Sequence, residues 1–130
     1  MELTTVVILN LIKTIDVMAF EGCTSLTSVT IPDSVIIIFP AAFRNCSSLV
    51  EVVIPDSVIT IGDYAFAGCM GLTTVVIPDS VTTIGANAFR QCTGLTEVVV
   101  PDHATIGDDA FPDGVTLTLS SEVVEIQPLK

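Results

Sequence analysis

Two files of side chains in this sequence have the chemistry to bind a metal ion or to form disulfides. Both files repeat every 23 residues, and they consist of the carboxylates Asp33, Asp56, Asp79 and Asp102 and the thiols Cys23, Cys46, Cys69 and Cys92. Calcium prefers several oxygen ligands that converge on one point, which a single file of carboxylates does not supply. The alternative is that Asp and the Ser that follows it cap a turn through their side chains. We expect turn capping and no metal site.

The cysteines are expected to be reduced. They lack the spacing of a metal site and occur once per repeat in an apolar column, as buried free thiols do. Stacked coils would bring equivalent Cα atoms to about 5 Å, but side chains in parallel register point the same way and not toward each other. His103 is the only histidine, without a partner nucleophile or a glycine-rich phosphate loop. We therefore expect neither an enzyme nor a cofactor site.

The 23-residue period itself predicts the architecture. A fixed repeat of this length, with hydrophobic positions in phase, indicates that each unit is one coil of a solenoid. Alternating inward residues such as Val52 and Ile54 predict a strand, and Pro55 ends it because proline has no N–H to donate. Gly62 is expected to permit a sharp bend with unusual backbone angles. A stacked aromatic column is expected from Phe20, Phe43, Phe66, Phe89 and Phe111.

We predict a strand-dominated α/β solenoid, a right-handed coil of about five and a half repeats with a parallel sheet on its concave face. The whole chain, 1–130, is one domain. It divides into an atypical first coil (1–25), regular repeats (26–94), and a shortened last repeat with a C-terminal cap (95–130). Leu117 and Leu119 are expected to continue the last strand, and Val123 and Ile126 are expected to point inward in the cap.

The string IPDSV stands at 31–35, 54–58 and 77–81, with Ile-Gly, Ala-Phe and Cys following in register. This pattern covers nearly the whole chain and resembles the BspA-like (treponemal-type) leucine-rich repeat. The resemblance implies a curved solenoid with its parallel sheet on the concave side. It also implies a role in adhesion and protein binding and not in catalysis.

Composition and charge limit the possible partners. The formal net charge is -11, with only four basic residues, so nucleic acid is not an expected partner. Although 50% of the residues are hydrophobic, polar residues interrupt every stretch before it reaches the length of a membrane span. Met1 and Glu2 lead directly into repeat sequence, so no secretory signal is expected in this sequence. These features predict a soluble or peripheral protein whose compartment the sequence does not indicate.

One candidate binding surface is the outer side of the predicted concave sheet. Its residues are Val7, Thr30, Glu51, Val53, Thr74, Val76, Glu97 and Val99. β-Branched side chains occur on strands for structural reasons alone, so a docking face and a plain strand surface are both open readings. A solenoid nonetheless offers such a face at low entropic cost, because its ladder is already rigid.

A second candidate is a hydrophobic group on the convex side near the N-terminus. It comprises Leu9, Leu11, Val17, Met18, Ile36, Ile37, Phe39, Pro40 and Ile59. Exposed apolar patches of this size usually mark an interaction site. The alternative is an atypical terminal coil that buries these side chains itself. Ile36, Ile37 and Phe39 favour contact with a partner, because they belong to the second coil and not to the first.

Together these observations predict a non-catalytic module for protein recognition or scaffolding, without a cofactor. The partner would be a protein, and a small peripheral subunit of a larger or membrane-associated assembly is one form of this role. The alternative is a structural solenoid that assembles with itself. It would stack through the leading strand, 3–8, because an uncovered edge accepts another strand.

Overall fold

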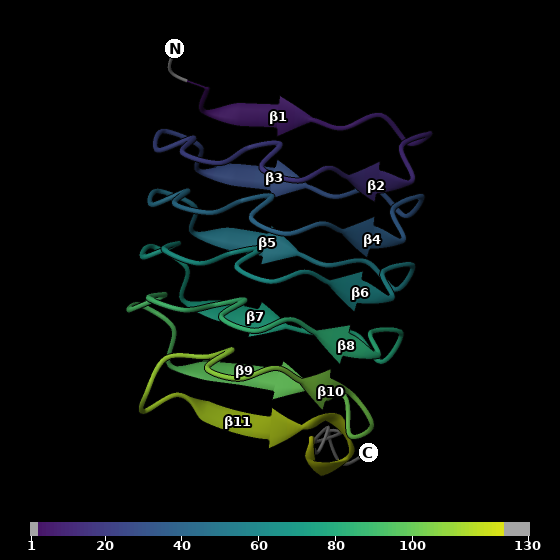
Figure 1. Ribbon diagram of the computed structural model, residues 1–130, viewed down its shortest axis with the longest axis vertical. Coiled ribbons are helices and arrows are strands. Elements are labelled where there is room, and N and C mark those ends of the chain that lie inside the picture. The colour runs from purple at the N-terminus through teal and green to yellow at the C-terminus, as the bar shows by residue number, and fades with distance from the viewer. Residues whose placement is uncertain (1–2, 124–130) are drawn as a thin grey trace, which may run out of the picture.

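The computed structural model describes residues 3–123, which form a stack of similar coils (Figure 1). Each complete coil contributes two short strands. The first strands are β1 (Thr5–Val7), β3 (Ser28–Thr30), β5 (Glu51–Val53), β7 (Thr74–Val76), β9 (Glu97–Val100) and β11 (Thr116–Leu119). The second strands are β2 (Thr14–Ile15), β4 (Ile37–Ile38), β6 (Thr60–Ile61), β8 (Thr83–Ile84) and β10 (Thr105–Ile106). The predicted strand-dominated solenoid is confirmed.

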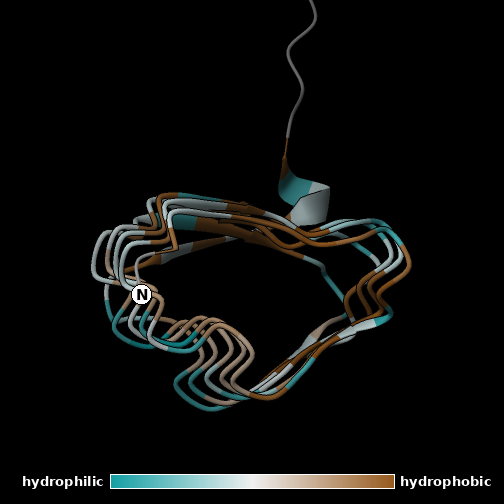
Figure 2. Ribbon diagram, turned by 90° about the horizontal axis from the view of Figure 1, so that it is seen from above, coloured by the Kyte–Doolittle hydropathy of each residue, from teal (hydrophilic) through white to brown (hydrophobic). Residues whose placement is uncertain are grey.

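All strand pairs are parallel, and their register follows the repeat. The first strands form the ladders β1–β3–β5 and β7–β9–β11, and the second strands form one five-stranded sheet. Val29 lies opposite Val52, and Ile38 lies opposite Ile61. Paired residues are 23 positions apart in the sequence where Thr60 pairs with Thr83. This separation falls by one where Thr83 pairs with Thr105, because one residue is missing from the last repeat. Viewed along the stack, equivalent segments superimpose and the two sets of strands line different sides of the core (Figure 2).

The core consists of columns of identical or similar side chains. In β5, Val52 is buried while its neighbours Glu51 and Val53 are exposed, as expected for a strand with one buried face. The predicted phenylalanine column is confirmed: successive rings from Phe20 to Phe111 stack with centroids 5.2–5.3 Å apart. Because every coil presents the same residue to its neighbour, each ring is in contact with an equivalent ring.

Two expectations about local structure need correction. Residues 3–123 contain no α-helix, and their one helix is the short 3-10 turn η1 (Ser120–Glu122), so the α part of the predicted class is absent there. Gly62 does not have a positive φ. It is needed because a Cβ would lie 2.6 Å from the Pro40 nitrogen of the preceding coil. The left-handed residue comes two positions later, at Tyr64 (φ 59°) and its equivalents in the other coils.

The serines of the IPDSV turns do not cap them. The Oγ atoms of Ser34, Ser57 and Ser80 are buried and have no hydrogen-bond partner. A backbone bond closes the turn instead, as where the amide of Val58 donates to the carbonyl of Pro55 at 3.1 Å. The serines therefore fill a small, tightly packed position without supplying the hydrogen bond that the sequence suggested.

The last described segment is anchored by one carboxylate. Leu117 and Leu119 continue the strand as predicted, opposite Val98 and Val100. After β11, Asp102 accepts hydrogen bonds from the Ser121 amide (3.1 Å) and the Ser120 hydroxyl (3.2 Å). Hydrogen bonding from Ser121, and secondarily from Ser120, lowers the pKa of Asp102 below its usual value. The predicted inward position of Val123 is wrong, because its side chain is 54% exposed. The same prediction for Ile126 lies outside the described residues.

Candidate protein-binding surfaces

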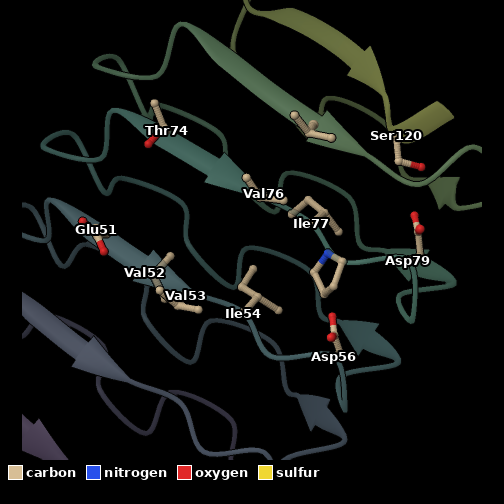
Figure 3. Close-up of a pocket in the computed structure, with 12 residues that line it drawn as sticks. Glu51, Val52, Val53, Ile54, Asp56, Thr74, Val76, Ile77, Asp79 and Ser120 are labelled. Carbon is tan, nitrogen blue, oxygen red and sulfur yellow. The ribbon is translucent and has the colours of Figure 1, made fainter. Parts of the chain in front are cut away.

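A hollow with a volume of about 520 Å³ lies over the first strands. We call it the sheet groove (Figure 3). Its central residues come from β5, β7 and β9, and its edge includes the turns that follow β5 and β7. Its lining includes Glu51, Val53, Asp56, Thr74, Val76, Asp79, Val99 and Ser120.

The sheet groove combines an apolar strip with acidic edges. Val53 and Val76 are 61% and 62% exposed, which is unusual for such apolar side chains in a rigid sheet. Glu51 lies toward one end of this strip, and Asp56 and Asp79 lie toward the other (Figure 3). An extended polypeptide could place small apolar groups over the valines and basic groups at the carboxylates, in keeping with the net charge of -11.

The structure gathers part of the predicted concave surface into this groove. Glu51, Val53, Thr74, Val76 and Val99 line it, whereas Val7, Thr30 and Glu97 are exposed on the same set of strands outside its lining. Sequence reasoning missed Asp56, Asp79 and Ser120 as groove residues. The sequence pattern suggested turn caps or metal ligands for the two aspartates, and not a place beside the concave sheet. Their place directly after the strand-ending prolines was the signal that could have located them beside the sheet.

The predicted convex group forms one connected surface in its central part. Ile37, Phe39 and Pro40 line a hollow of about 320 Å³ that continues past Gly62 and Gly85. We call it the glycine groove. Phe39 is half-buried there. Because glycine replaces a side chain at this position in the third and fourth coils, the ring of Phe39 stands at the start of an open channel.

Other members of this group lie beside the glycine groove. The Met18 amide donates to the Pro40 carbonyl at 3.1 Å, which places Val17 and Met18 in the coil next to Pro40. The Ile59 amide donates to the Ile36 carbonyl at 2.8 Å, so these two isoleucines are neighbours in adjacent coils. Binding at these positions stays a prediction.

Leu9 and Leu11 do not line the glycine groove. They lie in the turn between β1 and β2, and Leu9 lines a hollow of about 360 Å³ at the first coil, with Val6 and Phe20. Leu9, Leu11, Val17 and Met18 are each more than half exposed. The first coil therefore does not bury these four side chains, and the alternative of local self-burial fails for them within residues 3–123.

The cysteine file has a structural role. All four cysteines are free. Cys46, Cys69 and Cys92 are buried, and each thiol donates to a phenylalanine carbonyl of the preceding coil at 3.1–3.2 Å. Burial raises the pKa of Cys46 to about 12. A hydrogen bond with Cys92, together with burial, also raises the pKa of Cys69.

Alkylation should therefore distinguish Cys23 from the other three thiols. Cys23 is half-buried in the first coil, whereas the other three thiols are buried and less accessible to a reagent. We expect iodoacetamide to modify only Cys23 in the native protein at mildly alkaline pH, and all four cysteines in urea, as read by mass spectrometry. Equal native labelling of Cys69 would contradict the enclosed thiol file.

A metal cluster and a membrane-spanning helix are both absent from the described residues. Within residues 3–123, no group of three or more His, Cys, Asp or Glu side chains is placed to hold a metal ion. In the same part of the chain, no helix has the length and apolar character needed to cross a membrane.

Solved structures with this architecture match the chain closely. A leucine-rich cell surface protein from Faecalibacterium prausnitzii is 32% identical with a TM-score of 0.85, over 92% of this chain and 32% of that one. A leucine-rich repeat protein from Bacteroides ovatus is 33% identical with a TM-score of 0.80, over 88% and 33%. A leucine-rich repeat protein from T. pallidum is 27% identical with a TM-score of 0.64, over 88% and 73%.

This chain thus spans about a third of the length of the first two structures. No curated protein matches it. A family model described as the BspA type leucine-rich repeat region, in six copies, matches residues 1–122. The coil stack, the register of 23 residues and this match agree, and the chain belongs to the BspA-type leucine-rich repeat family.

Proposed function

We propose that this chain is a protein-recognition module that holds an extended, basic segment of a partner protein in the sheet groove. Leucine-rich repeat proteins of this family typically serve in protein binding or surface recognition. The single observation that carries the proposal is the exposed valine strip between carboxylates in the sheet groove.

The rigidity of the coil stack supports this assignment. Val53 lies on β5, which is paired with β3, and Val76 lies on β7, which is paired with β9. Both strands are held in fixed register by these neighbours, so binding would order few side chains and would cost little conformational entropy. Glu51, Asp56 and Asp79 would attract lysine or arginine side chains and speed the encounter. An acidic or phosphorylated segment would be repelled by the same groups. The partner is therefore defined by a basic, extended character with small apolar side chains.

A selection of displayed random peptides can test the proposal. We expect selected sequences to be rich in lysine or arginine next to small apolar residues, and binding to weaken as salt increases. Val76→Arg should reduce binding by at least tenfold, because it places a large cation on the apolar strip. Ile59→Arg is the matched control: it adds the same charge at an exposed apolar position (41% exposed) beside the glycine groove.

Both variants should keep the circular dichroism and thermal stability of the parent, because both changes are at exposed positions. If selected peptides lose binding to Ile59→Arg and keep it with Val76→Arg, the convex surface is the binding site and the sheet groove is not. If selected peptides are acidic, the proposed partner chemistry is wrong.

Self-assembly is a second candidate with its own supporting observation. Within residues 3–123, β1 pairs only with β3, so one edge of this strand has no partner. Side chains of the first coil are also exposed on that side. Stacking through this edge, and the role of a peripheral subunit in a larger assembly, stay predictions.

A further inference from the structure

A notch on the outside of the middle coils brings together two of the chain's four basic residues. It has a volume of about 230 Å³ and lies between Arg44 of the second coil and Arg90 of the fourth. Ala67, the buried equivalent in the third coil, contributes to its lining. The notch exists because the middle coil carries the smallest side chains, Ala67 and Gly68, where both neighbours carry long ones.

The repeats show that arginine and an amide occur together at this place. The corresponding residue pairs of the first four coils are Glu21-Gly22, Arg44-Asn45, Ala67-Gly68 and Arg90-Gln91. The second residue of each pair is left-handed, with φ of 62° at Asn45 and 63° at Gln91. Glycine adopts this conformation without strain, so Asn45 and especially Gln91 are the less stable choices. An amide therefore replaces glycine only where arginine precedes it.

Contacts within the protein hold both guanidinium groups beside the notch. Arg44 lies over the ring of Tyr64, 5.0 Å from its centroid. The Arg90 Nη1 donates to the Asn87 Oδ1 at 3.4 Å. Two coil spacings separate the arginine Cα atoms by roughly 10 Å. Unlike the sheet groove, this notch has no carboxylate in its lining, although the chain has a net charge of -11.

We propose that the notch binds one tetrahedral oxyanion, a phosphate or a sulfate group. Guanidinium groups donate paired hydrogen bonds to oxyanions, and a tetrahedral anion presents oxygens in opposite directions, toward both arginines at once. The amide groups of Asn45 and Gln91 add further donors from the same two coils. A carboxylate has two oxygens in one plane and carries less charge than a divalent phosphate or sulfate, so it should bind between the two arginines more weakly.

Calorimetric titration with inorganic phosphate and inorganic sulfate tests this site, with acetate and chloride at matched ionic strength as comparison anions. We expect saturable binding of phosphate or sulfate, and the stronger of the two identifies the preferred source. Arg44→Gln and Arg90→Gln should each weaken that binding about tenfold, because each removes one charged hydrogen-bonding group. Lys13→Gln removes the same charge outside the notch and should leave the affinity unchanged.

Gln91→Gly separates a binding role from a structural one. This change relieves a left-handed glutamine and removes one donor, so we expect a higher melting temperature together with weaker phosphate or sulfate binding. Acetate binding equal to that of the tetrahedral anions would overturn the proposal. An equal loss of affinity in Lys13→Gln would also overturn it, because the effect would then be one of overall charge. The phosphate and sulfate titrations are independent of the peptide experiment, because the peptides probe the sheet groove and the anions probe the notch.

Discussion

Replacing Phe66 by alanine should lower the free energy of unfolding by about 3 to 5 kcal/mol, the usual range for a phenylalanine removed from a core. Phe66 is fully buried and stacks on Phe43 and Phe89, each with centroids 5.2 Å apart. The cavity would lie between two coils whose positions are set by their strand pairing, so the neighbouring rings cannot close it without breaking the ladder. Stability passes from coil to coil in a solenoid, and a defect in the middle weakens both halves.

Urea unfolding followed by circular dichroism measures this loss. Phe111→Ala is the matched control, because Phe111 is half-buried and stacks on Phe89 alone among the described rings. We expect it to cost roughly half as much, since less surface and one ring contact are removed. Equal losses for the two variants would mean that the aromatic column does not transmit stability between coils.

The regular part of the fold could be predicted because one sequence pattern is repeated in register. Val52 and its equivalents alternate with exposed residues, and the phenylalanines return at a fixed spacing, so each coil confirms the reading of the next. The second sheet was not predicted, because strands of two residues such as β6 (Thr60–Ile61) are too short to show a period. The prediction that serine caps the turn was wrong, because Ser57 suits the conformation of a turn whether or not its hydroxyl forms a hydrogen bond.

The candidate sites were less predictable, because they depend on distances between coils. The sequence identifies which strand residues face outward, and Val53 and Val76 are indeed exposed. It does not show that Ser120 reaches the same groove, since that depends on the chain folding back onto Asp102 after β11. The arginine notch was missed for a similar reason. Arg44 and Arg90 are 46 positions apart in the sequence and are brought to one hollow only by the stacking of coils.

Gly62 is where the sequence and the structure give different reasons for the same residue, and substitution can separate them. Gly62→Ala should cost about 3 kcal/mol, the upper part of the usual range for overpacking. The added Cβ would lie 2.6 Å from the Pro40 nitrogen and 2.8 Å from the Phe39 carbonyl carbon. Both are backbone atoms, so relief requires the second and third coils to move apart. That movement would strain the hydrogen bond from the Gly62 amide to the Ile38 carbonyl, now 2.8 Å.

Gly62→Asn then shows whether glycine is needed at this position for left-handed backbone angles or for close contact between two coils. If Gly62 were needed for left-handed backbone angles, asparagine would be the best-tolerated replacement, because it visits that region more readily than alanine. If contact between coils is the cause, the larger asparagine should be at least as destabilising as alanine. Gly22→Ala provides the opposite control: Gly22 has φ 76° and nothing within 4 Å of an added Cβ, so its cost comes from conformation alone. At that position asparagine should be tolerated better than alanine, reversing the order expected at Gly62.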